Sequence, residues 1–263
     1  MNDSPDSHRE AMQPTEPSAG TSSRASATPS VDKRASRIRT MFAEIAPRYD
    51  FLNHLLSLGI DLRWRRKAVR LAGNPEGGPV LDVCCGTGDL ALAFRRAHPT
   101  GTAIVAADFC RPMLVIAKEK SARRRGSPIQ FIEADALNLP FPDNTFSLVS
   151  VAFGLRNVAD TDRGLCEMAR VCRPGGKVLV LEFTLPTIPV VGRLYRWYFH
   201  WVLPRIGQAV ARNRHSAYNY LPASVEEFPQ GSALLQRMAA AGLRDAKAFP
   251  MTFGIATLYS GTK

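Results

Sequence analysis

The sequence predicts a doubly wound α/β fold whose sheet is mostly parallel and ends in an antiparallel strand. Five short apolar runs rich in β-branched residues alternate with helical stretches, which is typical of parallel strands joined by right-handed crossovers. The runs barely alternate between apolar and polar residues, which indicates strands buried on both faces. The last two strand-like runs are separated only by Phe253 and Gly254. Because that link is too short for a parallel crossover, an antiparallel edge hairpin is expected at the end.

Composition places the chain among globular proteins with a basic body. Its 263 residues are 45% hydrophobic and 22% charged, which excludes the disordered, collagenous and transmembrane classes. The formal net charge is +11, and the charges of positions 1–36 nearly cancel, so the excess lies in the remainder. This basic part of the chain is expected to bind an acidic partner: a nucleic acid, an anionic membrane surface or a phosphorylated ligand.

Residues 1–34 are expected to form a disordered tail and residues 35–263 a single domain. The tail is dense in Ser, Thr, Pro and Ala, so it cannot bury enough apolar surface to offset the entropy of ordering. A transit peptide is the alternative, but the acidic residues of the tail argue against it. Five cysteines without a paired C-x-x-C spacing indicate neither a disulfide framework nor a zinc site, and no metal is expected. Without a signal-peptide core or a spanning apolar stretch, a cytoplasmic location is expected.

Helices precede the strands in the predicted domain. Apolar residues spaced three or four apart predict helices within residues 37–73, and Asp61 is expected to be the N-cap of a helix that ends at Gly73. The predicted parallel strands are Val80 to Cys84, Ala103 to Ala107, Ile129 to Glu133, Phe146 to Ala152 and Lys177 to Phe183. The predicted hairpin strands are Ala246 to Thr252 and Ile255 to Ser260.

The most informative stretch is Val80 to Leu90, in which a buried strand leads into glycines and then a helix. Glycines there let backbone amides approach a ligand, and the start of a helix favours a carboxylate or a phosphate. Gly86, Gly88 and Ala91 also satisfy the loose G-x-G-x-x-G/A dinucleotide fingerprint. The motif alone therefore leaves a nicotinamide cofactor open.

Acidic residues at neighbouring strand ends predict a cofactor crevice. Asp108 ends the second strand, where it can accept hydrogen bonds from both hydroxyls of a ribose, unless it is the N-cap of the next helix. Asp135 follows the third strand, where the exocyclic amine of an adenine can donate to it, unless it is a solvated loop acid. Asp82 lies four residues before Gly86, close enough to meet an amino group. Because only one mononucleotide-binding half is visible and the ending is antiparallel, a dehydrogenase is disfavoured, and the sequence resembles the class I methyltransferases that use S-adenosylmethionine.

Further motifs resemble one methyltransferase family. They are Met41-Phe42 with Ala46 to Asn53, Leu139 to Phe146, Phe153 to Val158, Leu181 to Phe183 and His200 to Gly207. From about residue 38 to its end, the chain resembles the UbiE/MenG family of quinone-biosynthesis C-methyltransferases. The resemblance implies that the S-adenosylmethionine site contains Thr87, Asp108, Asp135 and Ala136, beside Gly86, Gly88 and Asp82 derived above. At the position where many relatives have Ser, this chain has Ala152, so that contact lacks a hydroxyl.

The resemblance implies methyl transfer to a ring carbon of a reduced quinone. A ring carbon is a poor nucleophile until a neighbouring phenolic hydroxyl loses its proton, so the enzyme must favour the phenolate and hold the carbon about 3 Å from the methyl group. Arg156 is expected to stabilise that phenolate and Asn157 to orient it. The alternative is that Arg156 simply pairs with Glu182 or Asp143. Further candidates for proton handling are Tyr49, Asp50 and His200, and for His200 the alternative is a packed side chain.

The implied acceptor is demethylmenaquinol, with 2-methoxy-6-polyprenyl-1,4-benzoquinol, or both, as the alternative. Between Phe183 and Val225 no residue is acidic, and arginines lie among tyrosines and tryptophans, while Trp64 lies in a second basic run. Because this composition suits a membrane interface, both segments, including a lid over residues 186–225, are expected to cap the active site and touch an anionic membrane at its inner face. A lid that only packs on the domain is the alternative.

Two other classes of protein are alternatives to a quinone C-methyltransferase. A nucleic-acid methyltransferase would share the charge and the cofactor, but the fourth strand lacks an N/D-P-P-Y run, so no nucleic-acid partner is expected. A non-catalytic cofactor-binding subunit stays open. The oligomeric state stays open as well, a homodimer included.

Overall fold

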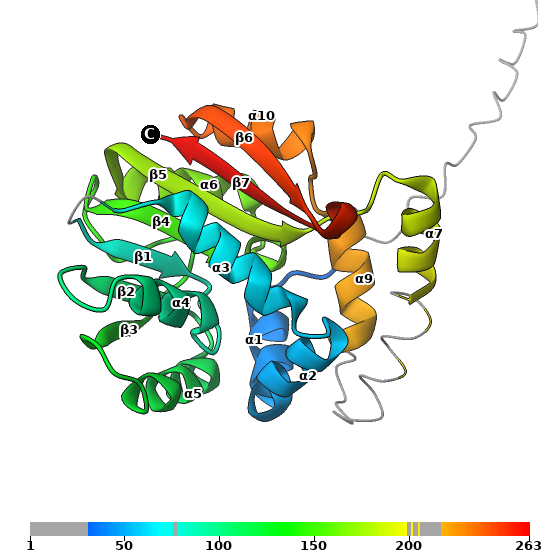
Figure 1. Ribbon diagram of the computed structural model, residues 1–263, viewed down its shortest axis with the longest axis horizontal. Coiled ribbons are helices and arrows are strands. Elements are labelled where there is room, and N and C mark those ends of the chain that lie inside the picture. Colours follow the sequence, from blue (N-terminus) through cyan, green and yellow to red (C-terminus); the bar gives the residue numbers. More distant parts are fainter. Residues whose placement is uncertain (1–30, 76–77, 199–200, 202–204, 206–216) are drawn as a thin grey trace, which may run out of the picture. The chain divides into compact units, whose positions relative to one another are not determined.

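A seven-stranded sheet forms the centre of the domain, in the order β3-β2-β1-β4-β5-β7-β6 (Figure 1). The computed structural model describes residues 31–75, 78–198, 201, 205 and 217–263. The strands are β1 (Val80–Val83), β2 (Ile104–Asp108), β3 (Ile129–Glu133), β4 (Phe146–Ala152), β5 (Cys172–Phe183), β6 (Arg244–Met251) and β7 (Ala256–Thr262). β7 runs antiparallel to both β5 and β6, and the other neighbouring pairs are parallel. The predicted doubly wound sheet with its antiparallel ending is confirmed.

Helices surround this sheet. The α-helices are α1 (Ala35–Ile45), α2 (Tyr49–Leu56), α3 (Ile60–Ala72), α4 (Asp89–Ala97), α5 (Arg111–Ala122), α6 (Thr161–Val171), α7 (Pro189–Trp197), α9 (Ala217–Glu227) and α10 (Ser232–Ala240). Short 3₁₀ turns are η1 (Ala46–Arg48), η2 (Leu155–Asn157) and η4 (Thr252–Gly254). In the described part of the chain, no helix is both long and apolar enough to cross a membrane.

The predicted start of α3 is wrong by two residues, whereas its end is confirmed. Gly59, with φ 72°, precedes the helix, and Asp61 lies inside its first turn. There Asp61 accepts a hydrogen bond from Arg65 instead of capping a backbone amide. At the other end Gly73 takes a φ of 75°, a value that favours glycine, and the helix stops there.

β5 begins earlier than its apolar run predicts. Its first residue, Cys172, pairs with Phe146, whereas Lys177 pairs with Leu148. The residues between these two pairs, 173–176, therefore bulge out of the ladder. A turn with two glycines can be accommodated as a bulge because Gly175 adopts a φ of 76°.

The sheet separates two apolar cores, and a third lies beyond the strand ends. α6 and α10 cover one face, through residues such as Met168 and Met238. The opposite face is covered by α3 and α4, through Trp64 and Phe94, and Figure 1 shows both helices in front of the sheet. The third cluster joins α1, α2, the start of α5, α7 and α9, and includes Leu52.

The third cluster lies where the fold predicts a ligand. The chain leaves β3 at one edge and returns at β4, directly beside β1, so β1 and β4 flank the topological switch point. Ligands of open α/β sheets bind at that point, outside the carboxyl ends of the strands.

Candidate active site

The loop between β1 and α4 has the conformation that its glycines predict. Cys84, Gly86 and Gly88 have φ values of 51°, 55° and 83°. A Cβ added at Gly86 would meet no atom within 4 Å, whereas one at Gly88 would lie 3.1 Å from the Cβ of Ala117 in α5. Gly86 therefore leaves open space beside the backbone, and Gly88 permits close packing of the loop on α5.

Asp82 lies beneath this loop. It is 1% exposed and accepts hydrogen bonds from the amide of Ala91, at 3.0 Å, and from the hydroxyl of Ser150, at 3.1 Å. Burial raises the pKa of its carboxyl to about 7. The expected contact between Asp82 and an amino group of the cofactor stays a prediction for this buried side chain. Asp82 positions the first turn of α4.

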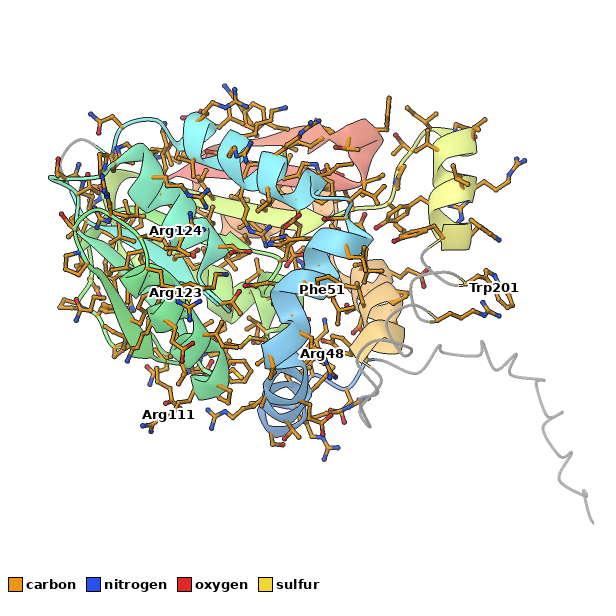
Figure 2. All side chains as sticks on the ribbon, turned by 60° about the horizontal axis from the view of Figure 1, so that its bottom comes forward. Arg48, Phe51, Arg111, Arg123, Arg124 and Trp201 are labelled. Carbon is orange, nitrogen blue, oxygen red and sulfur yellow. The ribbon has the colours of Figure 1, made fainter. Side chains whose placement is uncertain are left out.

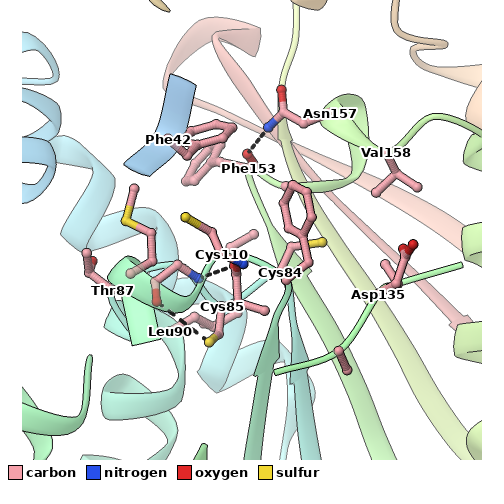
Figure 3. A pocket seen from close by; sticks show the side chains of 18 of the residues that line it. Phe42, Cys84, Cys85, Thr87, Leu90, Cys110, Asp135, Phe153, Asn157 and Val158 are labelled. Carbon is pink, nitrogen blue, oxygen red and sulfur yellow. Dashed lines mark hydrogen bonds between the residues drawn. The ribbon is translucent and has the colours of Figure 1, made fainter. Parts of the chain in front are cut away.

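A cavity lies at the carboxyl ends of β1, β2, β3 and β4. Figure 3 shows it with residues from all four strand ends and with Phe42 of α1 on its wall. The residues expected at the cofactor that line this cavity are Gly86, Thr87, Asp108, Asp135, Ala136 and Ala152. Gly88 and Asp82 are not on its wall. Segments far apart in the sequence thus meet as predicted.

The Asp108 carboxylate is fixed by two backbone amides. Gly86 N donates to Oδ2 and Cys110 N donates to Oδ1, each at 2.8 Å. Burial raises the pKa of this carboxyl. The N-cap position of α5 is Cys110, so Asp108 is not the cap of that helix. An ionised carboxylate has about four acceptor sites, so Asp108 keeps acceptor capacity for the two hydroxyls of a ribose.

Asp135 offers the acceptor that an adenine amine requires. Its Oδ1 accepts a hydrogen bond from Leu137 N at 2.9 Å, and within the described residues its Oδ2 receives none. Ala136 beside it is buried and presents an apolar surface. Together with Asp108 and the open backbone at Gly86, these residues fit an adenosyl group.

Thr87 belongs to an ion-pair network that connects the loop to α2, α4 and α5. Its hydroxyl donates to Asp50 of α2. The Nζ of Lys120 in α5 lies 2.6 Å from a carboxylate oxygen of Asp50, 2.6 Å from one of Asp89, and 3.3 Å from the Thr87 hydroxyl. Sequence reasoning missed Lys120 because a lysine on an amphipathic helix carries no local sign of its partners.

The same network continues into α3. His54 Nδ1 lies 2.9 Å from Asp61, which Arg65 also bonds, and ligand atoms of His54, Asp61 and Asp89 lie within 4.8 Å of one another. The cations of Arg65 and Lys120 pair with these carboxylates. The cluster is therefore an internal ion-pair network of the protein.

α3 turns its tryptophan inward, contrary to the expectation of a membrane contact there. Trp64 is 5% exposed, its indole donates to the Thr252 hydroxyl at 2.8 Å, and its ring centroid lies 6.0 Å from those of Phe153 and Phe183. Arg65 is buried as well. The exposed cations of this helix are Arg63, Arg66, Lys67 and Arg70. Without an exposed aromatic ring, α3 lacks the anchor that the sequence suggested.

A larger cavity of about 620 Å³ adjoins the first. Apolar and aromatic side chains of α1, α2, α3, α7 and α9 form most of its wall. The residues that line both cavities are Phe42, Tyr49, Arg65, Phe153 and Asn157. The two cavities therefore meet at these five side chains.

Arg156 lies on the wall of the larger cavity and pairs with Glu182. Its Nη1 lies 2.8 Å from Glu182 Oε2, and its backbone amide donates to Oε1 at 3.2 Å. The alternative pairing with Glu182 is thus confirmed, whereas Asp143 pairs with Arg170 instead. The Nε of Arg156 is buried without a partner in the described part of the structure.

Asn157 lies at the junction of the two cavities, and Figure 3 shows its amide above Phe153. Its Nδ2 donates to the Phe153 carbonyl at 3.4 Å, but its Oδ1 is buried and no described residue donates to it. A buried acceptor without a donor costs free energy, so Asn157 is ready to accept a hydrogen bond from a ligand.

Burial changes the pKa of several other titratable residues near the two cavities. Burial raises the pKa of Tyr49, against the opposing charges of Arg156 and Arg65, so its phenol is a hydrogen-bond donor at neutral pH and not a base. Burial also raises the pKa of Cys84 and Cys85 well above the usual range, so both are thiols beside the loop. His200 lies outside the described residues.

The sequence matches a known family and named relatives over most of its length. A model of the ubiE/COQ5 methyltransferase family matches residues 30–263. A demethylmenaquinone methyltransferase of Thermus thermophilus is 51% identical over 223 residues, which cover 85% of this chain and 100% of that protein. The ubiquinone/menaquinone biosynthesis C-methyltransferase UbiE of Geobacter sulfurreducens is 48% identical over 235 residues, 88% of this chain and 90% of that protein.

A solved structure shares the fold at low sequence identity. It is the crystal structure of a SAM-dependent methyltransferase of Thermotoga maritima, described as a possible histamine N-methyltransferase. The TM-score is 0.61 and the identity 16%, and the match covers 86% of this chain and 99% of that one. At this identity the likeness concerns the fold alone.

Proposed function

The chain belongs to the ubiE/COQ5 methyltransferase family, and we propose on this basis that it methylates a ring carbon of demethylmenaquinol, with S-adenosylmethionine as the methyl donor. The names of the Thermus and Geobacter relatives support quinone methylation. The observation that carries the proposal is the junction of two cavities: one fits an adenosyl group, and the other, about 620 Å³ and mainly apolar, fits a prenylated ring.

The residues of the smaller cavity have the chemistry to bind this cofactor. S-adenosylmethionine, when bound, supplies a methyl group on a sulfonium sulfur, which keeps the electron pair of the broken bond. Asp108 accepts hydrogen bonds from the ribose hydroxyls, and Asp135 accepts one from the adenine amine. The open backbone at Gly86, before the first turn of α4, is suited to a carboxylate.

Arg156 and Asn157 act on the acceptor ring in this proposal. The guanidinium cannot lose its proton, and Glu182 fixes it on the cavity wall, so Arg156 stabilises a phenolate instead of removing a proton. The free Oδ1 of Asn157 orients the ring by accepting a hydrogen bond from the phenolic hydroxyl before it loses its proton. The ring carbon gains the methyl group and loses its hydrogen, so one proton is released for each methyl group transferred.

The mouth of the larger cavity suits a membrane surface, and we place the enzyme on the cytoplasmic side of an anionic membrane. Leu58, Leu194 and Trp197 line the cavity yet are 84%, 64% and 55% exposed. Phe51 and Trp201, both labelled in Figure 2, are 61% and 58% exposed. Apolar side chains at the mouth would admit a prenyl chain directly from the lipid.

A liposome assay tests the membrane contact. Arg193→Glu with Arg196→Glu is expected to abolish co-sedimentation with vesicles that contain anionic lipid. The matched control reverses two charges on β6, Arg244→Glu with Lys247→Glu, because β6 contributes no residue to the cavity wall. Equal binding of both double variants would contradict the proposed surface.

Methyl transfer from labelled S-adenosylmethionine tests the activity itself. The purified protein is offered chemically reduced demethylmenaquinol and the 2-methoxy-6-polyprenyl-1,4-benzoquinol side by side, with the oxidised quinones as controls. Product from demethylmenaquinol alone is expected, and product from the benzoquinol would assign the ubiquinone pathway instead or in addition. Arg156→Ala is expected to lose activity at a temperature at which it is folded, and full activity would refute its role at the ring.

A further inference from the structure

Besides Arg156 and Asn157, which the proposed mechanism uses, the wall of the larger cavity has a further buried polar group. Tyr220 of α9 is 8% exposed, and its side chain lies on the wall of this mainly apolar cavity. Its hydroxyl is buried without a hydrogen-bond partner in the described part of the structure. Arg156 Nε and Asn157 Oδ1 on the same wall are in the same state. Because buried polar groups are normally paired, unpaired atoms on three residues of one cavity wall point to a polar ligand there.

α9 is fixed in a way that gives Tyr220 a defined position. Glu227 at its end accepts a hydrogen bond from Val31 N at 2.9 Å. Gln230 just beyond the helix donates to the Val225 carbonyl at 2.7 Å and accepts from Leu185 N at 2.8 Å. The helix also packs against η2, which carries Arg156 and Asn157. Tyr220 therefore belongs to a preformed wall of the same cavity as these two residues.

The hydroxyl of Tyr220 is a donor at neutral pH. Burial raises its pKa to about 12, although the charge of Arg156 acts in the opposite direction. A donor on an apolar wall matches an oxygen atom of a ligand. A quinol ring has two oxygen atoms on opposite carbons, and Arg156 with Asn157 accounts for only one of them.

We propose that Tyr220 donates a hydrogen bond to the second ring oxygen of the acceptor, the one opposite the hydroxyl addressed by Arg156 and Asn157. This rests on the proposed function and assigns a residue to the recognition of the second oxygen. Tyr220 is thus a residue that determines acceptor specificity, while the methyl transfer itself occurs on the other side of the ring.

Tyr220→Phe tests this with two ligands. One is demethylmenaquinol, and the other is its analogue without the second hydroxyl, a prenylated 1-naphthol, used as a competitive inhibitor. The variant is expected to raise KM for the quinol by about 5- to 10-fold and to leave the inhibition constant of the analogue within about 2-fold, since only the quinol loses a hydrogen bond.

Tyr198→Phe is the matched control. Tyr198 lines the same cavity, but its hydroxyl already donates to the Leu56 carbonyl at 2.8 Å. Its loss is therefore expected to lower the melting temperature and to leave the preference for the quinol over the analogue unchanged. Tyr220→Phe is expected to retain the wild-type melting temperature because its hydroxyl has no partner in the described protein.

The outcomes separate this inference from the proposed function. Equal changes for both ligands, no change for either, or a melting temperature lowered as in Tyr198→Phe would each overturn the role of Tyr220 and leave the proposed function intact. A wild-type protein that binds S-adenosylmethionine but turns over no quinol would overturn both.

Discussion

Arg156→Met is expected to destabilise the fold strongly, because it leaves a buried carboxylate without its cation. The side chains of Arg156 and Glu182 are 6% and 0% exposed, and their closest atoms are 2.8 Å apart. Glu182 also accepts hydrogen bonds from the amides of Arg156 and Phe183, each at 3.2 Å. These amides remain after the substitution, so the carboxylate keeps its position but not its neutralising charge.

The size of the effect follows from that geometry. Breaking a buried ion pair by removing one partner costs about 3–5 kcal/mol. Because the two amides still donate to Glu182, we expect the lower end of that range, and for a chain of this length about 3 kcal/mol corresponds to a fall of about 6–12 °C in Tm. Glu182→Gln is expected to cost a similar amount, since it leaves the guanidinium of Arg156 unneutralised.

The double variant Arg156→Met with Glu182→Gln separates charge from packing. It contains neither buried charge, so its cost is expected to be smaller than the sum of the single costs by at least about 1 kcal/mol. Urea unfolding followed by tryptophan fluorescence gives the three free energies, provided that the slopes agree. If the cost of the double variant equals the sum of the two single costs within about 0.5 kcal/mol, the unpaired charge is not the main cause of the destabilisation.

Four further predictions concern the loop and its supports. Asp108→Asn is expected to raise the Kd for S-adenosylmethionine by about 10- to 100-fold in calorimetric titration, because two charge-assisted hydrogen bonds to the ribose are weakened; unchanged binding would contradict the assignment. Lys120→Met is expected to cost about 1–2 kcal/mol in urea unfolding at low salt, and less at high salt, since two partly exposed carboxylates lose their shared cation. Gly154→Ala is expected to cost about 1–3 kcal/mol, because a Cβ there would lie 2.4 Å from the Cβ of Cys84, and adding Cys84→Gly should restore stability. The pKa of Asp82 is raised from 3.8 to about 7, so the folded state retains a proton that the unfolded state releases, and its contribution to stability falls as the pH rises from about 4 to about 7. Asp82→Asn should remove this fall. If the unfolding free energy of the variant had the same pH dependence as that of the wild-type protein, Asp82 would not be the responsible group.

The strands were predictable because their signals are local. Ile129–Glu133 and Phe146–Ala152 have the predicted bounds, since an apolar run that ends at a polar turn marks both limits of a buried strand. β5 was predicted too short because the bulge at residues 173–176 contains two glycines, which read as a turn in the sequence. The prediction that Asp61 caps α3 was wrong. An aspartate that can cap a helix can equally pair with an arginine one turn later, here Arg65, and the tertiary fold decides between the two.

The site was predictable where residues follow strand ends and not where helices meet. Asp108 and Asp135 line the cavity as expected, because topology alone brings the ends of parallel strands together. Trp64 and Arg65 have the composition of a membrane-facing helix, yet both are buried, because the side of α3 that faces the sheet depends on tertiary packing. Lys120 and Tyr220 carried no signal, since their partners lie on other helices.

The pairing of Arg156 with Glu182 and its role at the ring are compatible, although the sequence suggested them as alternatives. A buried ion pair gains little stability over apolar packing, so stability alone does not account for its presence. Glu182 binds Nη1 and leaves Nε without a partner, on the wall of a cavity where charge has to be stabilised during the reaction. The carboxylate thus fixes a permanent cation at a defined place in an apolar site. A preorganised charge of this kind is what the formation of a phenolate requires, because no reorganisation is needed when the charge develops.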